Sequence, residues 1–340
     1  MKRECYMGLS IIRYQDPKEG TAAQGGDQAA GNGERWGVLE GDIVYPLPLS
    51  LVVTADLLRA GAASLREQCD RDKGLAYDSL QILSPVTTPA KLICLGVNYA
   101  PHRAEAGLKT TRPAQMLMFG KDSSSVTGPF HDVIRPENVE LLDYEIELGL
   151  VLGRDITGAE TFRQGSLFPT VAAMVICNDI SARCDQFGQA FMQWFQGKSY
   201  RTFSPMGPVL YVLEDGDEDL IYNLSLTLTV NGDVRQQAQT AELVFSPAEA
   251  LTRISAVVDM AAGDVILTGT PGGVALKLEE ADRANLRDNL FQDTARRSIL
   301  LDSQRGKEAF LRPGDVVTAR IASTDGSLSL GEQRNKIVEP

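Results

Sequence analysis

The stretch Asp143-Tyr144-Glu145-Ile146-Glu147-Leu148-Gly149 alternates acidic and apolar residues and leads into an apolar run that ends at Leu152. Side chains of a strand point alternately to its two faces, so this alternation predicts a strand with Glu145 and Glu147 on the same face. Two inward-pointing carboxylates this close repel each other, and a hard cation such as Mg²⁺ or Mn²⁺ would neutralise them. A solvent-facing strand edge with acids that only maintain solubility explains the spacing equally well.

Strand-like runs predominate from Lys91 to the end of the chain, so we expect a mostly β structure there. These runs are Leu92 to Val97, Tyr144 to Leu152, Val171 to Asn178, Leu224 to Val230, Asp264 to Thr268 and Asp315 to Ile321.

Helical patterns are fewer in this part of the chain. Ser246 is followed by Pro247 in the first turn and by Glu249 three residues on. These residues predict a capping box and a helix that runs to about Met260. The charged stretch from Glu279 to Lys307 shows some helical periodicity and is predicted to be a surface insertion.

The first 88 residues have the pattern of a separate, smaller unit. Gly, Ala, Gln, Asn and Asp crowd together between Gly20 and Gly33, which predicts a flexible hairpin insertion between two strands. Residues from about Val53 to Arg71 have helical spacing, and Pro85 and Pro89 mark a linker. We therefore expect a small N-terminal domain at 1–88 and a second domain at 89–340.

Composition excludes several classes of function. The chain of 340 residues has 33 basic and 45 acidic residues, a net charge of −12, and no basic cluster, so a nucleic-acid partner is not expected. No apolar run reaches the ~20 residues of a membrane span, and the N-terminus lacks a secretory apolar segment, which predicts a cytoplasmic protein. The five cysteines follow no CxxC spacing, which argues against a disulfide framework and a zinc cluster.

A candidate acid–base pair follows the apolar strand Leu92 to Val97. His102 and Glu105 are three residues apart, which on a helical turn brings imidazole and carboxylate together. Glu105 could then fix the tautomer of His102 and raise its basicity, as a general base requires. A lone histidine is more often a packing or surface residue, and His131, the other histidine of the chain, has no partner at helical spacing.

Two further clusters carry polar groups suited to a site. Asp179 follows an apolar strand and could supply a third oxygen ligand, with Arg183 and Gln186 one and two helical turns further on. An ordinary helix N-cap at Asp179 with Arg183 as its partner four residues on explains the same spacing. Lys198 follows a glycine among several hydroxyl residues and could hold an anionic substrate, although the frame of a phosphate-binding loop is absent.

Taken together, these clusters resemble the fumarylacetoacetate hydrolase family from about Lys91 to the C-terminus. Members of the family show a strand like Ile-Cys-Leu-Gly-x-Asn-Tyr followed by His-x-x-Glu, as at 93–99 with His102 and Glu105 here. Further motifs follow in the family's order: Lys121 with Ser123-Ser124-Ser125, the 143–147 run, Asn178 to Arg183, Gly197-Lys198-Ser199 and Gly269-Thr270-Pro271-Gly272-Gly273-Val274.

The resemblance implies an α+β, mostly β fold, the family's mixed β-roll or distorted β-barrel, together with the small N-terminal domain and homodimers. It also implies site roles. The residues implied to bind Mg²⁺ or Mn²⁺ are Glu145, Glu147 and Asp179; His102, Glu105 and Lys198 are implied to be catalytic; and Arg183, Gln186 and Thr270 are implied to contact the substrate. One departure is that larger family members carry another aspartate upstream of the histidine, where this chain has 98–101 (Asn-Tyr-Ala-Pro). That departure argues against fumarylacetoacetate itself as the substrate.

The resulting hypothesis is a metal-dependent hydrolase that cleaves a carbon–carbon bond of a 2,4-dioxo acid, of the acylpyruvate or fumarylpyruvate type, to pyruvate and a carboxylic acid. The alternative is a decarboxylase, isomerase or dehydratase of 2-oxo acids on the same site, because fold does not decide the reaction. A binding protein that has lost its chemistry is the third possibility. The polar segment from His102 to Arg112 is predicted to be a lid over the site.

Overall fold

Two antiparallel strands, β11 (Ile146–Leu152) and β12 (Val171–Asn178), form the centre of the molecule. The computed structural model describes residues 8–17 and 33–340. Every residue of both strands is buried. Their side chains divide between two apolar cores, one on each face of the sheet, which explains why both strands are apolar throughout.

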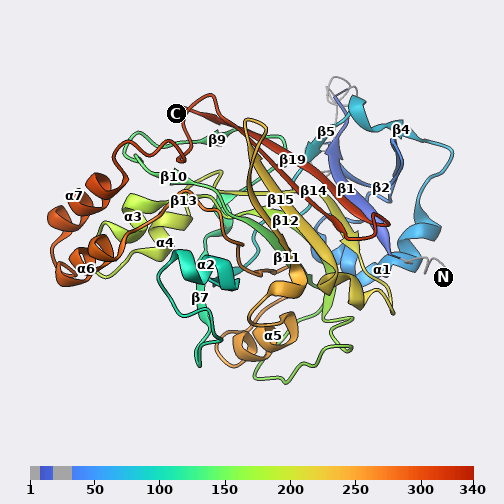
Figure 1. The fold of residues 1–340 in the computed structure, drawn as a ribbon. Helices are drawn as coiled ribbons and strands as arrows, with labels where there is room; N and C mark the ends of the chain where they lie inside the picture. Colours follow the sequence, from blue (N-terminus) through green and yellow to red (C-terminus); the bar gives the residue numbers. More distant parts are fainter. Residues whose placement is uncertain (1–7, 18–32) are drawn as a thin grey trace.

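These strands belong to a 12-stranded mixed sheet that crosses the molecule (Figure 1). Its pairing order is β4 (Leu75–Ala76), β3 (Ile43–Pro46), β2 (Glu34–Glu40), β1 (Leu9–Gln15), β14 (Ser204–Val212), β12, β11, β17 (Val265–Leu267), β6 (Leu92–Gly96) and β7 (Leu117–Lys121), with β5 (Gln81–Leu83) beside β1 and β8 (Val126–Thr127) beside β14. Most pairs are antiparallel, and β17–β6 and β14–β8 are parallel.

A second sheet of five strands carries the C-terminal part of the chain. Its order is β16 (Asp233–Gln239), β15 (Leu224–Val230), β18 (Val316–Ser323), β19 (Ser329–Val338) and β9 (Val133–Ile134), and a short pair joins β10 (Leu142–Asp143) to β13 (Ser181–Ala182). Burial alternates along β15, so one face of this sheet packs on the core. The predicted mostly β, α+β fold is confirmed, and its mixed sheets stay open and do not close into a barrel.

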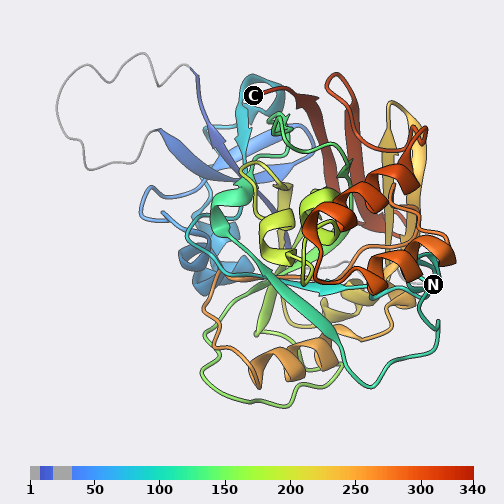
Figure 2. The same ribbon diagram turned by 90° about the vertical axis from the view of Figure 1, so that its left-hand side faces the viewer.

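Helices flank the sheets and gather mainly at one end of the molecule. They are α1 (Thr54–Gln68), α2 (Ala100–Glu105), α3 (Arg183–Phe187), α4 (Trp194–Lys198), α5 (Pro247–Ser255), α6 (Glu280–Asp288) and α7 (Asp293–Gln304). Figures 1 and 2 show α6 and α7 side by side over α3 and α4. The charged stretch from Glu279 to Lys307 is therefore a helical pair that covers the short helices beside the candidate site. In the described part of the chain, no helix combines the length and the apolar character that crossing a membrane requires.

The helix predicted from Pro247 to Met260 is shorter than expected. It ends at Ser255, because the backbone of Met260 pairs instead with Ile156. Ser246 caps the helix by accepting the N–H of Glu249, as predicted. The predicted capping box also requires the carboxylate of Glu249 to accept the backbone N–H of Ser246, and this part of the prediction is wrong. That carboxylate accepts instead from Arg253 and from Arg112, which lies outside the helix.

The N-terminal strands extend the main sheet, because β1 pairs with β14 as well as with β2. The predicted helix from about Val53 to Arg71 is confirmed as α1. The predicted hairpin insertion from Gly20 to Gly33 falls almost wholly outside the described residues, although the flanking strands β1 and β2 pair antiparallel. The boundary between domains at residue 88 stays a prediction.

Candidate active site

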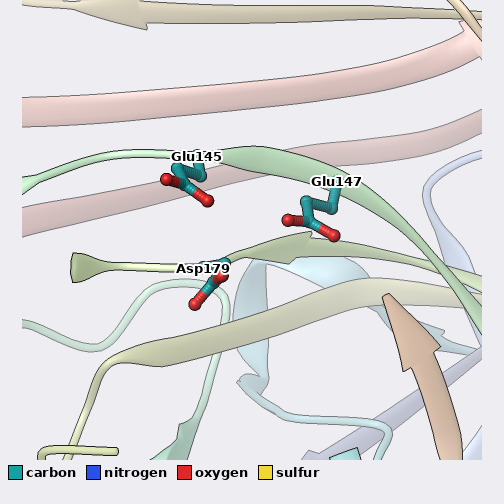
Figure 3. Close-up of side chains that lie close together, drawn as sticks. All are labelled: Glu145, Glu147 and Asp179. Atoms are coloured by element: carbon teal, nitrogen blue, oxygen red, sulfur yellow. The ribbon is translucent and has the colours of Figure 1, made fainter. Parts of the chain in front are cut away.

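Three carboxylates meet where β11 begins and β12 ends. Glu145 directly precedes β11, Glu147 lies within it, and Asp179 directly follows β12, as Figure 3 shows. The backbone N–H of Asp179 donates to the carbonyl of Glu145 at 2.8 Å, which places the two side chains next to each other. One oxygen from each of the three carboxylates lies within 4.8 Å of the others. All three residues are buried, so the alternative interpretation, a solvent-facing strand edge, is wrong.

Two buried lysines lie against this carboxylate triad. The Nζ of Lys198 donates to Glu145 at 2.8 Å and to Asp179 at 2.6 Å. The Nζ of Lys121 donates to the other oxygen of Asp179 at 2.5 Å and to the carbonyl of Phe203 at 2.7 Å. Asp179 is therefore paired with ammonium groups. The alternative interpretation, in which Asp179 is an ordinary helix N-cap with Arg183 as its partner, is wrong. Strand β13 follows Asp179, and helix α3 begins only at Arg183.

The guanidinium of Arg183 is tied to the same cluster. Its Nε donates to Asp143 at 2.8 Å, and one terminal nitrogen donates to Glu145 at 2.5 Å. The other terminal nitrogen donates to Oε1 of Gln186 at 2.9 Å. Asp143 also accepts the backbone N–H groups of Ala275 and, more weakly, the next residue, so it fixes the chain after β17 against Arg183.

Glu147 is the carboxylate with the least compensation. Among the described residues its carboxylate accepts one hydrogen bond, from the N–H of Gly269 at 2.6 Å, and has no ion pair. Burial and the negative charges of Asp179 and Glu145 raise the pKa of Glu147 well above its usual value. Burial also acts to raise the pKa of Glu145, but Lys198 and Arg183 outweigh it and lower that pKa to about 2.

This donor set fits a divalent cation. Carboxylate oxygens are the ligands that Mg²⁺ and Mn²⁺ prefer, and three of them converge here from buried positions. Glu147 forms no ion pair with the described residues and accepts one hydrogen bond, from Gly269, so the protein's own cations compensate this carboxylate only in part. Glu145, Glu147 and Asp179 would hold the ion.

The predicted acid–base pair lies on α2. Pro101 stands in the first turn, and Nδ1 of His102 is 3.6 Å from Oε2 of Glu105 one turn later. Both oxygens of Glu105 also face the N–H of Gly273 at 3.0 Å. Burial acts to raise the pKa of Glu105, but the imidazole and this N–H outweigh it and lower the pKa. His131 lies elsewhere and its Nδ1 accepts the N–H of Gly128.

A glycine is required where the loop after β17 meets Glu105. Gly273 has φ +102°, and a Cβ there would lie 1.9 Å from the carbonyl oxygen of Arg235. Side chains other than glycine would therefore force the backbone away and displace the N–H that holds Glu105.

A cavity of about 150 Å³ is lined by the acid–base pair and by Glu145, one of the three metal-ligand candidates. Its polar lining consists of His102, Glu105, Glu145, Arg183 and Thr270. The hydroxyl oxygen of Thr270 accepts from the amide of Gln236 at 2.8 Å. Gln186 and Lys198 do not line the cavity. Each is hydrogen-bonded to a residue that does, Gln186 to Arg183 and Lys198 to Glu145.

The other wall of this cavity was missed by the reasoning from sequence. It is aromatic, formed by Phe119 in the middle of β7, Phe187 at the end of α3 and Trp194 at the start of α4. The ring centroids of Phe119 and Trp194 are 4.9 Å apart, and those of Phe187 and Trp194 are 5.6 Å apart. No spacing in the sequence indicates that these three residues meet. Lys121, in contrast, stands in a motif of the resemblance, although no contact with Asp179 was expected.

Known proteins resemble this chain along almost its whole length. The family model "Fumarylacetoacetate (FAA) hydrolase C-terminal" matches residues 91–338. A mitochondrial oxaloacetate tautomerase of Bos taurus is 34% identical over 79% of this chain and 82% of its own length.

Two solved structures extend the likeness to the fold. A probable 2-hydroxyhepta-2,4-diene-1,7-dioate isomerase from Mycobacterium abscessus is 27% identical, covers 98% of this chain and 99% of its own, and has a TM-score of 0.69. A fumarylacetoacetate hydrolase from Exiguobacterium antarcticum is 25% identical over 98% of this chain and 100% of its own, with a TM-score of 0.69. The chain belongs to the fumarylacetoacetate hydrolase family.

Proposed function

We propose that this protein is a metal-dependent tautomerase or isomerase that moves a proton at C3 of a 2-oxo acid and so interconverts keto and enol forms. One observation carries the proposal: the His102–Glu105 pair opens into the same cavity as Glu145, one of the three convergent carboxylates. A base beside a cation site is the arrangement that abstraction of a proton next to a carbonyl requires.

The relatives support proton transfer over the hydrolysis expected from the sequence. The Bos taurus relative is named for oxaloacetate tautomerisation, and the Mycobacterium abscessus structure for an isomerisation. Hydrolytic cleavage of a 2,4-dioxo acid needs an activated water in addition to the proton transfer. The alternative of a 2-oxo acid isomerase therefore becomes the main proposal, and the hydrolase becomes the outcome that the experiment below must exclude.

Each group of the site has a role in this proposal. Glu145, Glu147 and Asp179 would hold Mg²⁺ or Mn²⁺, which as a Lewis acid polarises the 2-oxo group of the substrate. Lys198 holds Glu145 and Asp179 from outside the cavity, so we assign it a positioning role. Gln186 positions Arg183 in the same way.

His102 performs the proton transfer. Oε2 of Glu105 lies 3.6 Å from Nδ1, too far for a hydrogen bond, so we assign Glu105 the role of orienting the imidazole electrostatically while Nε2 takes the proton from C3. The electron pair of the C3–H bond forms the C2–C3 double bond, the π pair of the C2–O bond moves to the oxygen, and His102 returns the proton it took to that oxygen. The hydroxyl oxygen of Thr270 accepts from Gln236, which leaves its own hydrogen to donate to the substrate carboxylate.

Exchange of the C3 protons in D₂O tests this function directly. Proton NMR follows acetylpyruvate and oxaloacetate with Mg²⁺ and with chelator and records pyruvate and acetate in the same spectra, and bicarbonate is assayed in the same samples. We expect metal-dependent exchange that is faster than any formation of cleavage products. Stoichiometric pyruvate and acetate without excess exchange would overturn the tautomerase and restore the hydrolase; pyruvate and bicarbonate from oxaloacetate would indicate a decarboxylase.

The homodimer and the small-molecule 2-oxo acid partner belong to the same proposal. The cytoplasmic location stays a prediction from the sequence, whereas the Bos taurus relative is named as mitochondrial.

A further inference from the structure

We infer that the substrate's tail, the part beyond C3, is uncharged and apolar, with a planar aromatic group preferred, and that Phe119, Phe187 and Trp194 select it. This inference rests on the proposed function and narrows it. It separates this chain from a catalyst whose best substrate is oxaloacetate, the dicarboxylate in the name of the Bos taurus relative.

The shape of the wall supports an aromatic or apolar tail. The three aromatic side chains are only partly buried and line the cavity together with its polar groups. Phe187 meets Trp194 edge to face at an interplanar angle of 81°, and Phe119 is tilted by 41° to the same indole. Ring edges and faces are therefore both presented to a ligand, which suits a further ring. Aliphatic side chains complete this wall, namely Val97, Val274, Leu276 and Leu278.

The charges of the cavity argue against a second carboxylate. Among the described residues that line it, Arg183 is the one lysine or arginine, and each of its three nitrogens already donates within the protein. The ammonium of Lys198 lies 5.3 Å from the centre of the Phe119 ring but is paired with Glu145 and Asp179. Asp143 and Glu145 supply two negative charges to this single guanidinium. A carboxylate in the tail would be desolvated against aromatic rings without a free counter-charge, which is costly.

One pair of ligands compares an aromatic end of the tail with a charged one. 2-Oxo-4-phenylbutanoate and 2-oxoglutarate share the 2-oxo acid head and two methylene groups and differ in ending with phenyl or carboxylate. Their dissociation constants are measured by calorimetry on the full chain with Mn²⁺. We expect the phenyl compound to bind at least about tenfold more tightly, the scale on which apolar pockets discriminate. Equal binding, or tighter binding of 2-oxoglutarate, would overturn the inference.

Two variants of neighbouring residues in α4 test whether the aromatic wall causes the preference for the phenyl compound. Trp194 lines the cavity, whereas its neighbour Phe195 is 60% exposed and does not. Trp194→Ala is expected to abolish the preference for the phenyl compound, and the matched control Phe195→Ala is expected to keep it. Loss of the preference in both variants, or in neither, would contradict the assignment to Trp194.

A charge placed in the wall gives a test in the opposite direction. Leu278→Arg adds a cation to the apolar lining, so we expect it to tighten 2-oxoglutarate by about tenfold and to weaken the phenyl compound. Failure of this variant, once shown by circular dichroism to be folded, to favour the dicarboxylate would count against the charge argument.

Turnover keeps this inference apart from the proposed function. C3 exchange is compared for benzoylpyruvate, acetylpyruvate and oxaloacetate with Mn²⁺. Exchange that is fastest with benzoylpyruvate supports both the tail selectivity and the tautomerase function. Exchange that is fastest with oxaloacetate sinks the tail selectivity and leaves the tautomerase standing. Selective binding of the phenyl compound without exchange of any substrate supports the tail selectivity and sinks the tautomerase.

Discussion

Glu147→Gln is expected to change stability in opposite directions with and without metal. The substitution keeps the size of the side chain and an oxygen to accept the N–H of Gly269. It removes a buried negative charge that lies beside Asp179 and Glu145. The metal-free variant should therefore be more stable than the wild type, and the variant should lose most of the metal's stabilising effect.

The size of the metal-free effect follows from the distances. At up to 4.8 Å, two carboxylates repel by about 3 kcal/mol in an effective dielectric of about 20. Glu147 has two such neighbours, and Lys198 offsets one of them. The wild type limits this cost by protonating Glu147, because burial and the charges of Asp179 and Glu145 raise the pKa of that carboxyl well above its usual value. We expect Glu147→Gln to gain about 3 kcal/mol at pH 7 in chelator.

The pH dependence has a definite sign. Because the folded pKa of Glu147 is raised above 4.5, the stability that its protonated form contributes to the metal-free wild type is fully present below pH 4.5 and is lost as the pH rises through the folded pKa. Glu145 has its pKa lowered to about 2, so its contribution is lost only as the pH falls below 4.5 towards 2. The advantage of Glu147→Gln is therefore near zero at pH 4.5 and grows with pH.

Urea denaturation measures both effects, in chelator from pH 4.5 to 8 and in Mg²⁺ or Mn²⁺ at pH 7. A metal at 100 times its Kd adds about 2.7 kcal/mol to the wild type, and the variant should gain far less. Glu308→Gln, at an exposed position, is the matched control and should change neither quantity. A variant that is no more stable than the wild type in chelator, or that keeps the full metal effect, would refute the reasoning.

Three further changes test the rest of the site. His102→Ala should lower turnover by about 10²–10⁴-fold while Mn²⁺ still raises the unfolding midpoint as in the wild type; unchanged turnover would exclude His102 as the base. Asp143→Asn weakens the pairing of the buried Arg183, so urea denaturation should show a loss of about 3 kcal/mol, and a loss below about 1 kcal/mol would contradict that pairing. Gly273→Ala strains a backbone at φ +102° that Arg235 confines, and should cost about 1–3 kcal/mol in urea and reduce turnover; a variant unchanged in both would contradict the role of this turn.

Much of the fold was predictable because its strands have local apolar patterns, continuous in β12, which is buried on both faces, and alternating in β15, which is buried on one. Val171 to Asn178 and Leu224 to Val230 were predicted with the bounds that the structure has. The end of α5 was not predictable from the helical pattern, since a tertiary pairing with Ile156 takes the backbone of Met260. The joining of β1 to β14 is likewise a contact between residues about 200 positions apart, on which local patterns are silent.

The carboxylates were predictable for a different reason. The two-residue spacing of Glu145 and Glu147 makes them neighbours on any strand, and the resemblance to the family added Asp179. Spacing could not show that Lys121, 58 residues before Asp179, would neutralise it. The same limit applies to the aromatic wall, whose members come together only because β7, α3 and α4 pack around one cavity.

A crystal structure of the protein with Mn²⁺, with data collected at the manganese absorption edge, tests the central claim most directly. The account predicts one strong anomalous peak between Glu145, Glu147 and Asp179, at about 2.0–2.3 Å from an oxygen of each carboxylate. Ordered Mn²⁺ at another position, with these three carboxylates still paired only to Lys121, Lys198 and Arg183, would contradict it.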